Sequence, residues 1–435
     1  MLLQFAEHTS DSVMTPARIS PQRLRQRMEH LGTIGRGDSG GISRPPFSPA
    51  HVEAVHLVAQ MMHEAGLDPG VDEFGNLIGH GAGEDGPVLL VGSHLDTVPN
   101  GGMFDGALGV VAAVEAAQAL QDAGRHLRHR LVVIAFADEE GYAFDVGTLS
   151  SRALVGEIPR SRFGTLRDRS GRSLEAYLTA RAHGLPLARI PERTAAYVEL
   201  HVEQGPVLER MGRAVAAVES ITGILRTTVT FEGRAAHAGT TPMTTRADAL
   251  VGAAELVMAV RELALQHKDR AVGTVGRLSV HPGATNVIPG RVDLSVEVRS
   301  PDEHELDDLR VTVEQRSQTI AGQQGLRVTV GSWDRSPPVP MDPGVRDAVV
   351  RALQTCGQPA LTLPSWAGHD AGVLARYIPA GMIFVASTGG LSHSPQEHTP
   401  WEIAAIGTQV LVETLMILDN SNDPTRRLPV AYATR

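Results

Sequence analysis

The residues best suited to chemistry are a histidine and acidic residues that follow an apolar segment. His94 and Asp96 come after Val88–Val91, whose composition is typical of a buried parallel strand. Asp105 lies beyond a glycine-rich loop and just ahead of residues 106–114, which are too many and too alanine-rich for a strand and predict a buried helix. Imidazole and carboxylate are ligands of zinc, manganese, nickel and cobalt. On this stretch alone, capping of the loop and of the helix explains the same residues equally well.

The same pattern recurs along the chain. Three more apolar segments end close to metal-ligand residue types: Leu131–Phe136 before Glu140, Ala195–Leu200 before His201, and Met382–Ala386 before His393. The carboxyl ends of parallel strands meet at one edge of an open sheet, where such proteins bind ligands. Each histidine taken singly would more often be structural, so the argument rests on recurrence. These ligands suffice for two metal ions, each with three or more protein ligands, if the Asp105 carboxylate gives one oxygen to each.

Composition limits the class of protein. The 435 residues are too many for one small core and indicate two domains. A formal net charge of -10 argues against a nucleic-acid surface, which would require a basic patch. The single cysteine, Cys356, excludes internal disulfides and cysteine-built zinc sites, so any metal must be held by His, Asp and Glu.

We expect neither a targeting segment nor a membrane segment. We expect that no apolar span reaches the roughly 18 residues that a membrane helix requires. Met1–His8 has neither the basic start nor the long apolar core of a signal peptide. The sequence therefore predicts a cytoplasmic enzyme that acts on a small molecule and binds no nucleic acid and no membrane.

The candidate ligands are positioned by segments that alternate between strand and helix. This alternation predicts an α/β fold with a mainly parallel, doubly wound sheet. Besides the helix after Asp105, helices are expected at Pro21–Leu31, from Pro49 to about Ala65, from Pro343 to Gln354 and from Trp401 to Leu418.

The character of the sequence changes from about residue 214. Strands are expected at 226–232, 271–280, 291–299 and 326–333, and helices at 246–267 and 303–320. Their order, β-α-β-β-α-β, is the ferredoxin-like pattern. We therefore expect a catalytic domain formed by residues 1–213 and 333–435, with a ferredoxin-like α+β domain inserted at 214–332.

Several motifs make the sequence resemble a known family. GSHLDTVPNGGMFDGALGV, ADEEG, HVEQGP, GRAAHAGTTPM, GATNVIPG, EVRSP, AGHDA and LSHSPQEHT occur in this order between about residues 23 and 418. Together they resemble the N-carbamoyl-L-amino-acid hydrolase and allantoate amidohydrolase group of the dinuclear aminoacylase and carboxypeptidase superfamily. The short interval between His94 and Asp105, and a histidine rather than a carboxylate at 201, favour the carbamoylase side of that superfamily.

The resemblance implies a ligand set for two divalent metal ions, zinc, manganese, nickel or cobalt. One ion would be bound by His94, Asp105 and His201. The other would be bound by Asp105, Glu140 and His393.

The resemblance also implies the proton chemistry. Glu139 would be the general base when a metal-bridging water attacks the carbonyl carbon, because that water must lose a proton and the departing nitrogen must receive one. Asp96 would orient His94 from behind the metal. The alternative, that Glu139 and Glu140 are a solvated acidic pair in a loop, would leave the second ion short of a ligand.

The inserted domain is expected to serve the substrate and the dimer. By resemblance, His237 donates to the carbonyl oxygen of a substrate bound in the neighbouring subunit, and this domain acts as the lid and forms the homodimer. Asn286 and Arg299 would hold the substrate carboxylate. Gln204 would contact the carbamoyl or amide end, and Gly368 would allow close approach to the backbone. Without the resemblance, Arg299 would be read as an ordinary surface arginine.

Some positions depart from the family pattern. Trp366 stands where glycine is usual, Ala386 where proline is common, and Gln396 where an acid is common. Residues 142–146 cannot be matched one by one. These departures bear on the substrate and leave the expected ligands intact.

The reading that follows is hydrolysis of an N-carbamoyl L-amino acid to the amino acid, carbon dioxide and ammonia. Allantoate amidohydrolase and β-ureidopropionase are alternatives with the same chemistry. An aminoacylase or dipeptidase is a further alternative, as is an inactive, metal-free binding relative. The presence of Glu139 with every expected ligand argues against the inactive relative.

Overall fold

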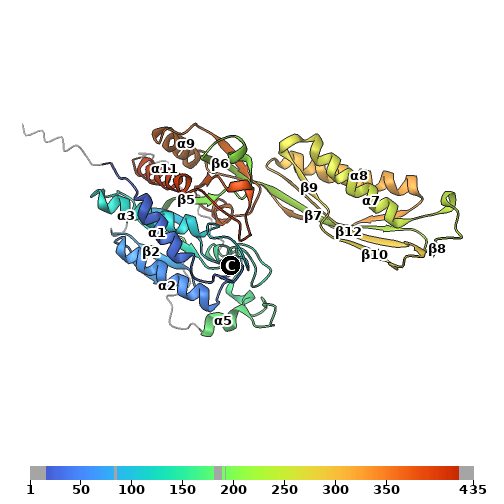
Figure 1. Ribbon diagram of the computed structural model, residues 1–435, viewed down its shortest axis with the longest axis horizontal. Helices are drawn as coiled ribbons and strands as arrows, with labels where there is room; N and C mark the ends of the chain where they lie inside the picture. Colours follow the sequence, from blue (N-terminus) through green and yellow to red (C-terminus); the bar gives the residue numbers. More distant parts are fainter. Residues whose placement is uncertain (1–15, 83–85, 181–188, 192, 421–435) are drawn as a thin grey trace, which may run out of the picture. The chain divides into compact units, whose positions relative to one another are not determined.

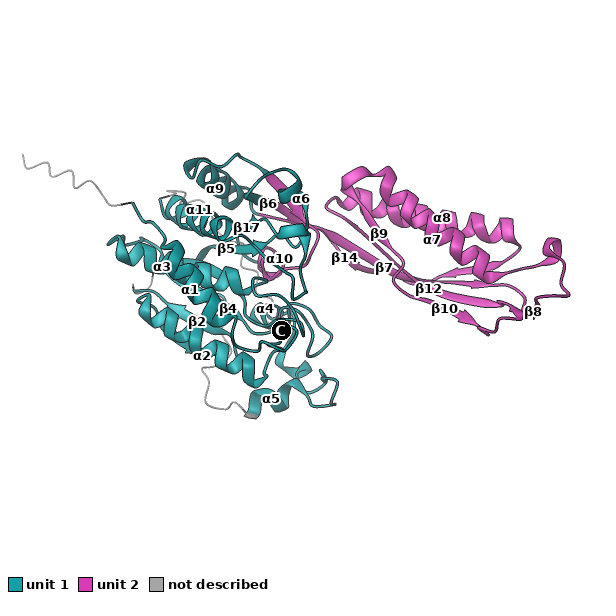
Figure 2. Cartoon of the chain, viewed as in Figure 1, with its two compact units in different colours: residues 1–217, 342–361, 377–435 teal, residues 218–341, 362–376 magenta. Residues whose placement is uncertain are grey.

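A computed structural model describes residues 16–82, 86–180, 189–191 and 193–420 (Figure 1). They form two compact units (Figure 2). Unit 1 lies within Met1–Ala217, Asp342–Leu361 and Tyr377–Arg435, and unit 2 comprises Val218–Met341 and Thr362–Arg376. The expected division at residues 213/214 and 332/333 stays a prediction. The compact units are divided differently, because unit 2 also includes residues 362–376. The expectation for Met1–His8 lies outside the described residues.

Unit 1 is built on a mixed sheet. Its strand order is β1-β2-β4-β3-β5-β17-β6-β15, where β15 is Val339–Pro340, and β16 (Thr362–Ser365) also pairs with β6. The strands are β1 (Asp68–Val71), β2 (Leu77–His80), β3 (Val88–His94), β4 (Arg130–Phe136), β5 (Thr194–Val202), β6 (Val215–Ile221) and β17 (Ala380–Val385). In its centre β3 pairs in parallel with β4 and β5, and β17 pairs in parallel with β5. The flanking pairs, β2 with β4 and β6 with β17, are antiparallel. The α/β class and the mainly parallel centre of the sheet are as predicted.

Helices cover this sheet. The longer ones are α1 (Pro21–Leu31), α2 (Pro49–Glu64), α3 (Ala107–Asp122), α9 (Pro343–Thr355) and α11 (Trp401–Asp419), and the short ones are α4 (Leu149–Leu154), α5 (Leu174–Ala180) and α6 (Val207–Arg210). The predicted starts of α1 and α2 are confirmed, because a serine caps each helix and a proline occupies its first turn.

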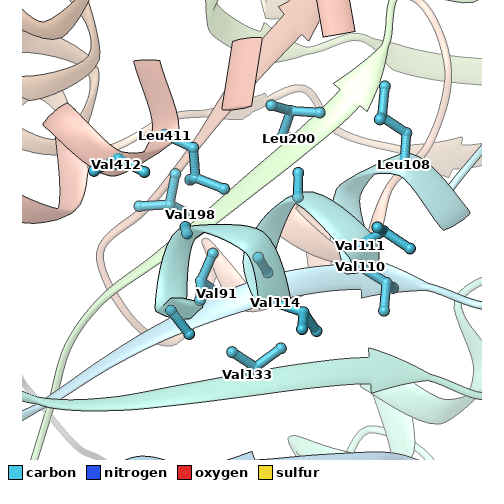
Figure 3. Close-up of a cluster of buried hydrophobic side chains, with 14 of the residues drawn as sticks. Val91, Leu108, Val110, Val111, Val114, Val133, Val198, Leu200, Leu411 and Val412 are labelled. Atoms are coloured by element: carbon cyan, nitrogen blue, oxygen red, sulfur yellow. The ribbon is translucent and has the colours of Figure 1, made fainter. Parts of the chain in front are cut away.

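Helix α3 lies in the middle of the core. It packs against β3, β4 and β5, with α11 beside it (Figure 3). Val110, Val111 and Val114 are fully buried in this layer, and each such side chain contributes about 1.5–3 kcal/mol by leaving water. Close packing depends on Gly109, where a Cβ atom would lie 2.1 Å from the Leu200 carbonyl oxygen. The core therefore fixes the helix that follows Asp105.

Helix α11 corrects one expectation. It has 19 residues and, by length and composition, is long and apolar enough to cross a membrane. The prediction that no span reaches this length is therefore wrong. Half of its most apolar 18-residue stretch is buried. The helix packs on α3, α9 and β17 of unit 1. Its apolar face thus belongs to the core of this unit.

Unit 2 has a second sheet with the order β10-β12-β7-β13, to which β9 and β14 add. Its elements are β7 (Gly223–Glu232), β8 (Ala236–His237), α7 (Ala249–Gln266), β9 (Val272–Thr274), β10 (Leu278–His281), β11 (Val287–Ile288), β12 (Arg291–Ser300), α8 (Glu303–Gln324), β13 (Arg327–Val330), β14 (Asp334–Ser336), β15 (Val339–Pro340), β16 (Thr362–Ser365) and α10 (Asp370–Leu374). The strand predicted at 271–280 is divided into β9 and β10. Both strands pair with β12, but at different places along it.

The two long strands of unit 2 set its dimensions. β12 and β7 pair over their whole length, from Arg291 opposite Glu232 to Ser300 opposite Gly223. Ten residues at about 3.4 Å each span roughly 30 Å. The small β8–β11 ladder follows directly at the Arg291 end, where Gly233 N–H donates to the Gly290 carbonyl. Features at the two ends of β12 are therefore far apart within one copy of unit 2.

Candidate metal centre

Two ligands of the candidate centre are positioned by β3 and by the turn into α3. His94 is the last residue of β3. Asp105 precedes Gly106, which has φ of 60°, and a Cβ atom at Gly106 would lie 2.4 Å from the His94 ring. Only glycine allows this turn, which brings Asp105 to the histidine. Asp105 does not cap the helix, since Gly106 is the N-cap and has no side-chain cap bond.

His94, Asp105 and His201 form the first ligand group. Nε2 of His94 and Nε2 of His201 each lie 3.3 Å from Oδ1 of Asp105, and 3.4 Å from one another. The Nδ1 atoms are used elsewhere: His94 Nδ1 bonds to the Asp96 carbonyl at 3.0 Å and His201 Nδ1 to the Val202 carbonyl at 2.9 Å. In the neutral rings these carbonyls hold the proton on Nδ1, so both Nε2 lone pairs face the carboxylate.

Asp105, Glu140 and His393 form a second group. Nε2 of His393 lies 3.2 Å from Oε2 of Glu140 and 3.5 Å from Oδ2 of Asp105. Asp105 thus presents Oδ1 to the first group and Oδ2 to the second. Oδ1 of Asp105 and Oε1 of Glu140 are buried without a hydrogen-bond partner among the described residues. Buried carboxylate oxygens without partners, beside imidazole lone pairs, fit divalent cations.

The electrostatics of the protein alone attract positive charge to this place. Burial would lower the pKa of His94, but Asp105, Glu139 and Asp96 outweigh burial and hold that pKa well above its usual range. Glu140 is the main cause that raises the pKa of His393 to about 9. Burial would raise the pKa of Asp105, yet His201 and His94 hold it well below its usual value. A site that holds protons this strongly also favours a metal cation.

Asp96 contacts His94 through its backbone. Its backbone carbonyl, and not its carboxylate, bonds to His94, whose Nδ1 lies 3.6 Å from Asp96 Oδ1. The carboxylate instead accepts the backbone N–H groups of Glu139 and Glu140, at 3.1 and 3.2 Å. Burial is the main cause that raises the pKa of Asp96 to about 6. Asp96 therefore joins the end of β3 to the turn that carries the two glutamates.

Glu139 lies at the first group, with Oε2 3.9 Å from Nε2 of His94. Gln204 also lies in the cluster, and its amide donates to Oδ2 of Asp105 at 2.7 Å. Sequence reasoning missed Ser392, which donates to the same oxygen at 2.6 Å. It also missed Glu397, which contacts Ser392. Both residues lie in the LSHSPQEHT motif close to His393. This closeness in sequence was the only feature that could have indicated their place in the site.

His237 and Asn286 lie together in unit 2. β8 pairs with β11 so that His237 is opposite Val287, and the Asn286 carbonyl accepts the Ala238 N–H. Nδ1 of His237 accepts the N–H groups of Gly239 and Thr240, at 3.0 and 3.3 Å. The neutral ring therefore carries its proton on Nε2, and the side chain is exposed. His237 is thus prepared to donate a hydrogen bond.

Arg299 lies at the other end of β12. Glu297 accepts from its Nε, and the Trp366 carbonyl accepts from its NH1 at 2.6 Å. Gly368, in the loop after Trp366, is exposed. Because roughly 25 Å of strand separate Arg291 from Arg299, one copy of unit 2 does not bring Arg299 together with Asn286. The two residues act on one carboxylate only if they come from different copies of the chain.

The fold of unit 1 brings two groups of possible metal ligands together, an arrangement that suits metal-assisted hydrolysis. The chain belongs to Peptidase family M20/M25/M40, whose profile matches residues 90–417. It is 42% identical over 406 residues to an N-carbamoyl-L-amino acid amidohydrolase of Geobacillus stearothermophilus, with 91% of this chain and 98% of the relative covered. It is 34% identical to an allantoate amidohydrolase of Bacillus subtilis, with 89% and 95% covered.

Solved structures agree with this family. An amidase of the hydantoinase/carbamoylase family from Burkholderia multivorans superposes with a TM-score of 0.88 at 32% identity, and 93% of this chain and 99% of that chain are covered. The resemblance to the carbamoylase and allantoate amidohydrolase group is therefore confirmed. The chain is a hydrolase of C–N bonds other than peptide bonds.

Proposed function

We propose that this protein hydrolyses an N-carbamoyl L-amino acid to the amino acid, carbon dioxide and ammonia. The observation that carries the proposal is the position of Asp105, which offers a different oxygen to each of two ligand groups. The relatives that align over nearly the whole chain include N-carbamoyl-L-amino-acid amidohydrolases, which supports the substrate class.

The proposal includes two divalent ions, zinc, manganese, nickel or cobalt. His94, Asp105 and His201 would hold one, and Asp105, Glu140 and His393 the other. Such ions lower the pKa of a water molecule and polarise a carbonyl group. Nitrogen and oxygen ligands accept any of these metals. The metal is therefore identified by measuring activity after the chelated protein is reloaded with each one.

Glu139 is the proton carrier in this proposal. Its Oε2 atom is near the first ligand group but belongs to neither, so the carboxylate is left to take the proton of the attacking water. The same atom then returns that proton to the departing amino nitrogen. Asp96 holds the turn through the Glu139 N–H, which fixes the position of this carboxylate.

Unit 2 supplies the substrate contacts and the dimer. The catalytic domain would comprise 1–213 and 333–435, with the ferredoxin-like lid at 214–332. Nε2–H of His237 would donate to the substrate carbonyl in the neighbouring subunit, with Asn286 beside it. Arg299 and Gly368 would bind the carboxylate end, and Gln204 the carbamoyl end. The separation of Asn286 from Arg299 within unit 2 supports a shared site.

An apolar stripe on unit 2 supports a homodimer. Val251, Met258 and Leu265 are exposed at seven-residue spacing on α7, and Leu278 is exposed on β10. α7 packs over β9 and β12, on the β10 half of the sheet, whereas α8 covers the β13 half. A second copy would bury this stripe. A cytoplasmic location also belongs to the proposal.

The substrate is tested by ammonia release from chelated protein that has been reloaded with each metal in turn. The panel contains N-carbamoyl L-amino acids, allantoate, N-carbamoyl-β-alanine, N-acetyl amino acids and dipeptides. Turnover of carbamoyl L-amino acids above all others supports the proposal. Preference for allantoate, the substrate named for the Bacillus subtilis relative, would replace it, and activity on acetyl or dipeptide substrates alone would reject it.

A further inference from the structure

Glu397 connects the loops that carry two of the candidate metal ligands. Oε1 of Glu397 accepts the backbone N–H groups of Phe104 and Asp105, at 2.8 and 2.9 Å. Oε2 accepts from Oγ of Ser392 at 2.8 Å. The first loop ends at Asp105 and the second contains His393, so one carboxylate spans both.

The surroundings of Glu397 are built around this contact. The side chain is buried, with 5% of its surface exposed. At Gly102 a Cβ atom would lie 2.1 Å from Oε1 of Glu397, so the glycine leaves the space that the carboxylate occupies. Oγ of Ser392 lies within hydrogen-bond distance of both Oε2 of Glu397 and Oδ2 of Asp105, the oxygen that faces the second ligand group, so its one hydrogen is shared between the two carboxylates. Among the described residues, the hydrogen bonds of the Glu397 side chain therefore lead to the Asp105 loop and to Ser392.

The second ligand group has a reason to need such support. His393 is half exposed and adopts a left-handed backbone conformation, with φ of 54°. Gly389 and Gly390 before it share that conformation. A non-glycine residue in this conformation is strained and persists only when its surroundings fix it. His94 and His201, by contrast, project from strands and are fully enclosed.

We propose that Glu397 is the positioning residue of the second metal site, which holds Asp105 and the His393 loop in register. The inference rests on the proposed metal centre and deepens it. Glu397 belongs to neither ligand group. It acts through the backbone N–H of Asp105 and through Ser392. Its carboxylate accepts hydrogen bonds from the loop that ends at Asp105 and is a polar partner for the loop that contains His393.

Glutamine should therefore replace Glu397 without loss. Its amide oxygen can accept the N–H groups of Phe104 and Asp105, and its NH2 group can donate to Oγ of Ser392. The single hydroxyl hydrogen of Ser392 is then left for Asp105. Alanine supplies none of these contacts. The comparison of Glu397→Gln with Glu397→Ala separates hydrogen bonding from charge.

The test is a zinc titration of the chelated full-length protein against a competing chelator, with no substrate present. Wild type is expected to bind two zinc ions. Glu397→Ala should weaken one of the two sites by about 10–100-fold, the usual effect of losing a partner behind a metal ligand. Glu397→Gln should stay within about threefold of wild type. The neighbouring and exposed Gln396 provides a control, as Gln396→Ala should leave both sites unchanged.

Gly102→Ala gives an independent variant should Glu397→Ala fail to fold, because the added methyl group displaces the carboxylate and leaves every ligand in place. It should weaken the same site. Thermal unfolding without zinc distinguishes positioning from a general loss of stability. Unchanged binding of both ions by Glu397→Ala or Gly102→Ala would overturn the inference, and so would a glutamine variant as weak as alanine. If wild type itself bound no second ion, the metal centre of the proposed function would fail instead.

Discussion

At the scale of residues, the centre assigns different tasks to neighbouring carboxylates. Glu140 faces His393, whereas Glu139 lies near His94 without belonging to either ligand group. The Asp96 carboxylate belongs to neither group and accepts the backbone N–H groups of both glutamates, which holds the turn that carries them. This division explains how adjacent acids of one type can have separate roles in metal binding and proton transfer.

Glu139→Gln should abolish turnover and leave metal binding intact. The amide keeps the size of the side chain but cannot accept the proton of the attacking water, which typically costs about 10²–10⁴-fold in rate. Ammonia release and metal content, measured on the same preparation, check this. The matched variant Glu140→Gln should lose metal at the second site. Normal turnover by Glu139→Gln would remove the assigned base.

The pH dependence of metal binding should follow His393. Its pKa is raised to about 9 in the metal-free protein, mainly by Glu140. A raised pKa stabilises the metal-free fold fully below the ordinary value near 6.5 and loses that contribution as pH rises through about 9. A metal must displace this proton, so its affinity should increase with pH up to about 9. Melting temperatures with and without zinc from pH 6.5 to 9 should therefore diverge. A gap that narrows as pH rises would contradict the assignment.

At the scale of elements, a helix or strand could be predicted from the sequence where neighbouring residues determine it. The bounds of α1 follow from Ser20 and Pro21, and β3 and α3 follow from apolar runs of different length. The grouping of the candidate ligands was predictable because parallel strands bring their carboxyl ends to one edge of the sheet.

Contacts between distant loops were not predictable. Whether Asp96 uses its carbonyl or its carboxylate depends on the geometry of one turn. Glu397 and Asp105 are bonded across 292 positions of sequence, and no period or propensity records such a contact. The division of residues 271–280 into β9 and β10 likewise depends on pairing with β12 and not on local composition.

The two glycines that flank α3 provide a test of the turn that carries Asp105. Gly106 and Gly124 flank the helix with φ of 60° and 62°, but only Gly106 faces the His94 ring, whereas a Cβ atom at Gly124 meets open space. Alanine at Gly124 should cost about 1–2 kcal/mol of unfolding free energy from backbone strain alone. Gly106→Ala should cost more and should also lose metal. Urea unfolding and zinc titration of both variants check this, and equal effects of the two changes would show that the contact with His94 is unimportant.

At the scale of the whole molecule, the site is expected to draw on two copies of the chain. Within one unit 2, His237 and Asn286 lie at the Arg291 end of β12 and Arg299 at the other end. A strand of this length is rigid when it pairs along its whole length, as β12 does with β7. One substrate of amino-acid size cannot span it, so residues from both ends converge only across a dimer.

Complementation between two inactive variants tests this arrangement. Glu139→Gln retains His237, and His237→Ala retains Glu139, so a mixed dimer in which His237 serves the neighbouring subunit regains one complete site. Random reassociation of equal amounts should restore about a quarter of wild-type turnover, because half of the dimers are mixed and each has one working site. The measurement is ammonia release before and after the two variants are exchanged, with each variant exchanged against itself as the control. If His237 served its own subunit, neither chain of the mixed dimer would contain a complete site and no activity would return. Recovery therefore identifies transfer of the histidine between subunits, a result that loss of activity in either single variant cannot provide.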